Sequence, residues 1–83
     1  MKKRKSYEEI KRNPKNIRFQ RICKVAEVFG FTMRKGKGSH HIFVHSEIEE
    51  LLNFQNIGGK AKPYQVKQLI KIIERYGLLE EDK

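Results

Sequence analysis

The chain has 83 residues, which is enough for one small domain, and it carries a formal net charge of +9. A balance this basic in so small a domain is typical of a protein that binds a polyanion, and nucleic acid is the first candidate. No apolar run approaches the ~18 residues of a membrane span, and the basic start leads into a polar stretch instead of an apolar secretory core, so we expect a cytoplasmic protein without a membrane partner.

Two helices are predicted in the first third of the chain. Residues Ser6 to Glu9 resemble a capping box and predict a short helix that ends near Arg12, within a basic arm over residues 1–12. Asn13-Pro14 is typical of a helix start, and apolar residues then recur at helical spacing as far as Gly30. The lone cysteine, Cys23, lies on this apolar stripe and is expected to be a small core residue, since it has no partner for an intrachain disulfide.

A β-hairpin is predicted next. Residues 31–34 form a plausible strand, residues 35–38 a glycine turn, and His40 to His45 a second strand. The following segment is ambiguous. Ser46 and Glu49 have the spacing of a capping box, which favours a helix, whereas the apolar Leu52 and Phe54 alternate with polar neighbours as in a strand. A loop followed by a third strand is the favoured interpretation.

The last element is predicted to be a helix. Gly58-Gly59 interrupts the chain, Lys62-Pro63 starts the helix, and Gly77 ends it ahead of an acidic tail over residues 80–83. The order α-β-β-β-α predicts an α+β domain over residues 13–79. Its three-stranded antiparallel sheet would carry both helices on one face and leave the other face for a partner.

The segment from Arg34 to Phe43 is the candidate site. Its two glycines allow backbone N–H groups to approach a phosphate, and three cations surround the turn. A hydroxyl and two imidazoles follow at once, and imidazole has an unperturbed pKa, about 6.5, that suits proton transfer near neutrality. The residues concerned are Arg34, Lys35, Lys37, Gly38, Ser39, His40 and His41.

Simpler interpretations compete with a catalytic one. A histidine beside a glycine turn is more often a hydrogen-bonding residue, and a basic turn is often only a solvated hairpin tip. Metal binding by His40, His41 and His45 is disfavoured, because neighbouring strand residues point to opposite faces and no set of acids or cysteines completes a tetrahedral site. We therefore expect no metal and no cofactor.

Several separated motifs resemble the HicA toxin family of bacterial type II toxin–antitoxin systems. The resemblance runs from about Asn13 to Leu78 and is carried by residues 29–31 (FGF), 38–43 (GSHHIF), 52–55 (LNFQ) and 60–68 (KAKPYQVKQ), and by Ile73. It implies a fold like the double-stranded RNA-binding domain and the activity of an mRNA interferase, a small endoribonuclease that cleaves mRNA. It also implies a HicB-like antitoxin that masks the catalytic histidine.

The family's catalytic histidine maps best onto His40, while His41 stays open. The chain departs from shorter members in its basic arm and in the long segment from residue 54 to 68, which leaves the antitoxin's docking mode undefined. Our hypothesis is that one histidine takes the proton of the RNA 2′-hydroxyl while the cations and amides of the turn hold the phosphate. Four lysines at and on the last helix either extend this RNA-binding surface or are merely solvated: Lys60, Lys62, Lys67 and Lys71.

Two other classes of function remain. The first is a non-catalytic RNA-binding module of the same fold, which recognises the shape of the RNA backbone. The second is an interaction domain whose charge serves an acidic protein partner. The first predicts RNA binding without cleavage, and the second predicts no RNA affinity even at low salt.

Overall fold

The structure, a computed structural model, describes residues 2–79, apart from the side chain of Lys35. The predicted acidic tail, residues 80–83, lies outside this range. The elements in chain order are α1 (Lys2–Arg12), α2 (Phe19–Val28), β1 (Thr32–Lys37), β2 (His40–His45), β3 (Ile48–Ile57), β4 (Lys60–Ala61) and α3 (Pro63–Arg75). The predicted α+β class is confirmed; the structure extends the predicted N-terminal helix back to Lys2 and adds a short fourth strand to the three predicted.

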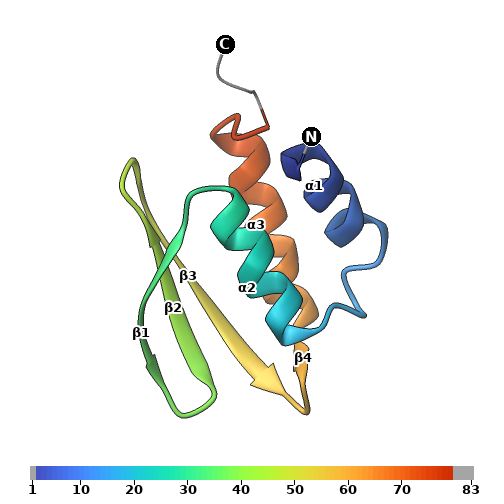
Figure 1. The fold of residues 1–83 in the computed structure, drawn as a ribbon, viewed down its shortest axis with the longest axis vertical. Coiled ribbons are helices and arrows are strands. Elements are labelled where there is room, and N and C mark those ends of the chain that lie inside the picture. The colour runs from blue at the N-terminus through green and yellow to red at the C-terminus, as the bar shows by residue number, and fades with distance from the viewer. Residues whose placement is uncertain (1, 80–83) are drawn as a thin grey trace.

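The four strands form one antiparallel sheet in the order β1-β2-β3-β4. Helices α2 and α3 lie side by side on one face of it, and α1 packs against both of them on the side away from the sheet (Figure 1). The other face of the sheet is open. Among the described residues, no helix combines the length and apolar character that a membrane crossing requires.

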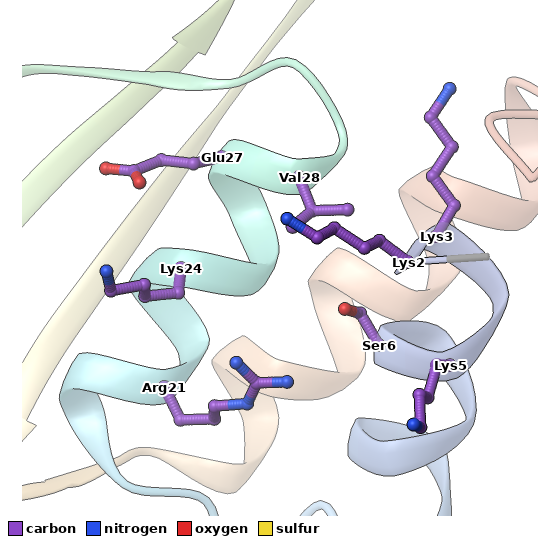
Figure 2. Close-up of a pocket in the computed structure, with 8 residues that line it drawn as sticks. All are labelled: Lys2, Lys3, Lys5, Ser6, Arg21, Lys24, Glu27 and Val28. Atoms are coloured by element: carbon purple, nitrogen blue, oxygen red, sulfur yellow. The ribbon is translucent and has the colours of Figure 1, made fainter.

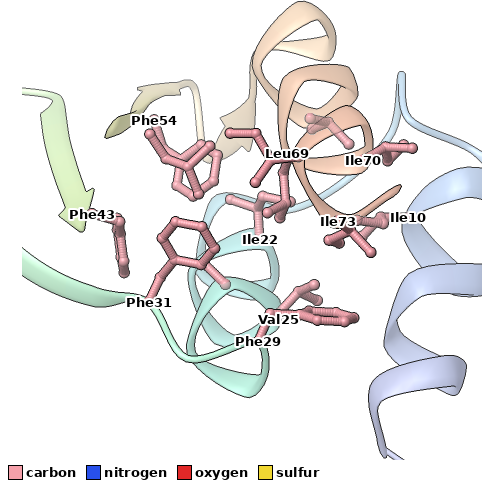
Figure 3. Packing of buried hydrophobic residues seen from close by; sticks show 14 of the residues in the cluster. Ile10, Ile22, Val25, Phe29, Phe31, Phe43, Phe54, Leu69, Ile70 and Ile73 are labelled. Atoms are coloured by element: carbon pink, nitrogen blue, oxygen red, sulfur yellow. The ribbon is translucent and has the colours of Figure 1, made fainter. Parts of the chain in front are cut away.

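The core lies between the sheet and the helices, and three phenylalanines from the sheet side form its centre (Figure 3). Phe31 precedes β1, Phe43 lies on β2 and Phe54 on β3, and all three are almost fully buried. They face Ile22 of α2 and a row of apolar residues on α3. From α1 comes Ile10, which is completely buried, so the N-terminal helix shares this core.

The predicted start of the second helix at Asn13-Pro14 is wrong, because α2 begins only at Phe19. The N–H of Asn16 donates to the carbonyl of Asn13, so Pro14 lies in a tight turn, a setting that favours asparagine and proline as much as a helix start does. The chain then runs extended beside β4. There the carbonyl of Ile17 accepts from the N–H of Ala61 at 2.9 Å. This non-local pairing overrides the local helix signal.

The hairpin is longer and tighter than predicted. Strand β1 continues to Lys37, so the turn consists of Gly38 and Ser39 alone, and Gly38 takes a φ of +61° as the first residue of the loop. A positive φ there suits the two-residue loops that join antiparallel strands. After β2, only Ser46 and Glu47 separate it from β3. The third strand predicted through Leu52 and Phe54 is therefore confirmed, although β3 already begins at Ile48 where a loop was expected, and the capping-box alternative is wrong.

Helix α1 confirms the short helix predicted to end near Arg12, but it begins at Lys2 and not at Ser6. Ser6 is buried inside the helix instead of capping it. The apolar stripe formed by Tyr7 and Ile10 packs on the other helices, and such tertiary contacts stabilise helical turns that local capping signals do not predict. The predicted start of α3 at Pro63 and the break at Gly77 are confirmed.

Cys23 is half-buried on α2 against the core, as the sequence predicted, and burial raises the pKa of its thiol to about 11, with a smaller contribution from Glu27. Since only the thiolate reacts with alkylating agents, we expect iodoacetamide at about pH 8 to modify the folded protein at least tenfold more slowly than the urea-unfolded protein. Mass spectrometry of timed aliquots measures this ratio. Equal rates in the two states would contradict the burial of the thiol.

Candidate functional site

The two adjacent histidines of β2 point to opposite faces of the sheet, as strand alternation requires. His40 is exposed on the open face. His41 is partly buried on the helix side, where its ring lies 4.9 Å from the ring of Phe19 on α2. The structure thus separates the two candidates, with one imidazole accessible to a large ligand and the other packed against a helix.

His40 lies in a row of residues that crosses three strands. In the sheet register, Lys37 of β1 is its direct neighbour on one side and Gln55 of β3 on the other. Directly paired residues of antiparallel strands share a face, so these three side chains belong to the open face. The Nδ1 atom of His40 is 3.4 Å from Oδ1 of Asn53, an amide on the same face. A titratable group, a cation and two amides therefore gather at one end of the sheet.

The hairpin loop beside His40 is tied to the end of β3. The carbonyl of Ser39 accepts a hydrogen bond of 2.9 Å from the N–H of Asn56, which in turn pairs with Ala61 of β4. Each strand-to-strand step is about 4.8 Å, so β4 lies within about 10 Å of the loop. Strand β4, which begins with the exposed Lys60 and is followed by the exposed Lys62, therefore lies at the same end of the molecule as the β1–β2 hairpin (Figure 1).

His41 is part of the packing on the helix side. Its Nδ1 atom is buried and has no hydrogen-bond partner among the described residues. Gly36 of β1 faces this ring, and a Cβ at Gly36 would lie only 3.0 Å from Cδ2 of His41. The predicted placement of Gly36 in the hairpin turn is therefore wrong, because Gly36 lies in strand β1 and leaves space for the imidazole. Only Gly38 lies in the turn.

His45, the third histidine, is also structural in its contacts. Its Nδ1 atom accepts the N–H of Glu47 at 3.0 Å, and its ring meets the ring of Phe31 edge-on at 5.0 Å. Within residues 2–79, no group of three or more histidines, cysteines or acids is placed to hold a metal ion.

The cations predicted for the hairpin and for the last helix occupy three regions. Arg34 lies at a β-bulge and reaches the open face, where it borders a hollow with Ile42, Val44 and Leu51. Lys37 lies beside His40, and the side chain of Lys35 is outside the described part of the structure. Lys67 is separate from both groups. It lies on α3, where it lines a different hollow together with Tyr64.

A further cationic groove of about 610 Å³ lies between α1 and α2, and Figure 2 shows the two helices as its walls. Glu9 accepts a hydrogen bond of 2.6 Å from Nη2 of Arg21 across the two helices, and this bond holds the pKa of the Glu9 carboxyl below its usual value. The sequence showed that the arm is basic, but not that it forms a groove with α2. The residues lining the groove are Lys2, Lys3, Lys5, Ser6, Arg21, Lys24, Glu27 and Val28.

Three residues near His40 were not singled out as functional in the sequence: Asn53, Gln55 and Gln65. The N–H of Gln55 donates to Oε1 of Gln65 on α3 at 2.7 Å, and Gln65 is almost fully buried. This bond fixes the first turn of α3 against β3 beside His40. The alternation of Asn53 and Gln55 with apolar neighbours could have indicated that both lie on the open face. The role of the buried Gln65 could not be predicted, because it depends on a contact between α3 and β3.

Comparison with family models identifies this chain over most of its folded part. The model described as the HicA toxin of bacterial toxin–antitoxin systems matches residues 19–75, which include every strand, α2 and α3. Comparison with curated proteins and with solved structures gives no significant match. The match covers more than half of the chain and confirms the resemblance drawn from its motifs. The chain therefore belongs to the HicA toxin family of bacterial toxin–antitoxin systems.

Proposed function

We propose that this chain is a metal-independent endoribonuclease that cleaves mRNA and uses His40 as its general base. The observation that carries the proposal is the position of His40, exposed on the open face between Lys37 and the amides of Asn53 and Gln55. Membership of a toxin family known for mRNA interferases supports it. The net charge of +9 favours a polyanionic substrate.

The chemistry follows from RNA itself, which carries its nucleophile in the 2′-hydroxyl. We assign the His40 tautomer in which Nδ1–H faces Oδ1 of Asn53, so that Nε2 is free to take the 2′-hydroxyl proton. The 2′-oxygen then attacks the adjacent phosphorus, the bond to the 5′-oxygen breaks, and that oxygen takes a proton from water and leaves as a hydroxyl, while the protonated His40 returns its proton to solvent. The products are a 2′,3′-cyclic phosphate and a 5′-hydroxyl.

Cations and backbone amides would stabilise the crowded phosphate during this step. Lys37 is the direct neighbour of His40, and the turn amides of Gly38 and Ser39 adjoin it. Arg34 and Lys35 would add positive charge from β1, and Lys60, Lys62 and Lys67 would hold the flanking phosphates. Groups fixed in advance around a developing charge are usually the largest contribution to catalysis. His41 would act by positioning β2 through its contact with Phe19.

Family membership implies an antitoxin partner. We propose a HicB-like antitoxin that covers the open face and so masks His40, with both proteins in the cytoplasm, where mRNA is present. Beside His40, this face carries the apolar side chains of Ile42 and Val44, with Leu51 about half exposed. An apolar patch rimmed by polar residues is typical of a protein interface.

The test is to incubate purified protein with end-labelled mRNA in the presence of EDTA and to identify the ends of the fragments. We expect fragments that carry a 2′,3′-cyclic phosphate and a 5′-hydroxyl, since no metal-bound water takes part in the proposed reaction. Fragments with a 3′-hydroxyl and a 5′-phosphate would contradict the mechanism. Tight RNA binding without cleavage would instead support the non-catalytic RNA-binding module.

A further inference from the structure

Tyr64 is a large aromatic side chain left exposed at the start of α3. It is 67% exposed, more than any other large apolar residue within residues 2–79. It also lines a hollow of about 280 Å³ together with Lys67, Gln68 and Lys71. These residues follow Tyr64 by three, four and seven positions, so they lie along the same side of the helix. An exposed ring bordered by two ammonium groups is the combination that binds nucleic acid bases and phosphates.

The position of Tyr64 relative to His40 is fixed by its neighbour Gln65. The Oε1 atom of Gln65 accepts the N–H of Gln55 at 2.7 Å, and Gln55 is the residue directly paired with His40. The first turn of α3 is therefore held against β3 at the level of His40. Strand β3 lies about 4.8 Å from β2, so one strand separates the backbone of His40 from the first turn of α3, with the His40 side chain on the open face and α3 on the helix face.

No other strand intervenes between His40 and the first turn of α3. Strand β4 pairs only with Asn56 and Ile57, so at Gln55 the neighbour of β3 is the first turn of α3, where Gln65 accepts the Gln55 N–H. A nucleic acid strand that passes over His40 on the open face would cross β3 at this level to reach the first turn of α3. In Figure 1 the start of α3 and the β1–β2 hairpin lie at the same end of the molecule.

We propose that Tyr64 stacks against an unpaired base close to the cleaved nucleotide, while Lys67 and Lys71 bind the phosphates beside it. This inference rests on the proposed RNA substrate, and it specifies that the RNA is single-stranded next to the cleaved nucleotide. A base in a duplex presents only its edges, whereas an unpaired base exposes the face that an aromatic ring needs. The hollow contains no acidic side chain, so its charge complements a phosphate backbone.

The test measures binding separately from cleavage. A fluorescent single-stranded RNA with 2′-O-methyl groups lacks the nucleophile, so its affinity is obtained by anisotropy without hydrolysis. Replacing an aromatic residue that stacks on one base by alanine lowers the affinity for a single strand by about 5- to 150-fold. We therefore expect Tyr64→Ala to raise the dissociation constant by roughly tenfold or more. Tyr64→Phe should bind as the wild type does, because it keeps the ring.

Two controls make the result specific. Tyr76→Ala removes a partly exposed tyrosine at the other end of α3, where it bonds to Glu50, and should leave the affinity unchanged. A 2-aminopurine placed at successive positions should lose fluorescence in one register with the wild type and Tyr64→Phe, but not with Tyr64→Ala. Affinity for a methylated duplex of the same sequence should not depend on Tyr64.

The outcomes separate this inference from the proposed nuclease function. Unchanged single-strand affinity in folded Tyr64→Ala, or an equal loss with the duplex, overturns the stacking site whether or not RNA is cleaved. A Tyr64-dependent affinity in a protein that never cleaves unmodified RNA supports the stacking site and contradicts the nuclease proposal. Absence of any RNA affinity in the wild type overturns both.

Discussion

Substitution of His40 by alanine is expected to lower the rate of RNA cleavage by at least about 100-fold, since general base catalysis contributes about 10²- to 10⁴-fold. The imidazole is exposed and its nearest polar contact is 3.4 Å away, so the free energy of unfolding should change by no more than about 0.5 kcal/mol. Single-turnover cleavage assays and urea denaturation of the same preparations measure the two quantities.

The matched control is the neighbouring histidine, tested with a variant that keeps the packing. His41→Phe retains an aromatic ring against Phe19 and removes both ring nitrogens, including the buried Nδ1 that lacks a partner. We expect this variant to remain folded and to cleave RNA within about tenfold of the wild-type rate. The assignment of roles would be reversed if folded His41→Phe were inactive while His40→Ala cleaved normally.

The parts of the fold that the sequence predicted are those set by local patterns. Helix α3 has an apolar stripe at helical spacing between a proline and a glycine, and β2 has a hairpin turn on one side and an apolar centre, so both were predicted closely. The start of α2 was predicted five residues too early, because Asn13-Pro14 fits a turn as well as a helix cap and the choice depends on pairing with β4.

In the candidate site, too, the residues that local sequence patterns mark were predicted and those that depend on distant contacts were not. The histidines and the cations of the hairpin were recognisable because they are consecutive in the sequence, and strand alternation predicted that the histidines would face opposite ways. Their partners were not recognisable. Asn53 lies near His40 through the β2–β3 register, and the first turn of α3 is held at β3 through the hydrogen bond of Gln65 to Gln55. Such contacts join distant parts of the chain and follow from tertiary structure alone.

Substitution of Phe43 by alanine is expected to lower the free energy of unfolding by about 3–5 kcal/mol, the range for a large aromatic side chain lost from a core. Phe43 is only 1% exposed, and its ring lies 5.4 Å from that of Phe54. A domain of this size belongs near the lower end of the usual range of about 5–15 kcal/mol, so this loss should leave a measurable fraction of the protein unfolded at physiological temperature. Urea denaturation followed by circular dichroism measures it.

Leu51→Ala is the control, because Leu51 lies on the adjacent strand but is 53% exposed on the open face, and its loss should change stability by no more than about 0.5 kcal/mol. Similar losses for the two variants would contradict the placement of the core on the helix side of the sheet.

Phe43 lies between His41 and His45 on β2, so its removal also loosens the strand that carries His40. Cleavage by Phe43→Ala should therefore fall in proportion to the unfolded fraction and recover on cooling, whereas His40→Ala should stay inactive at every temperature at which it is folded.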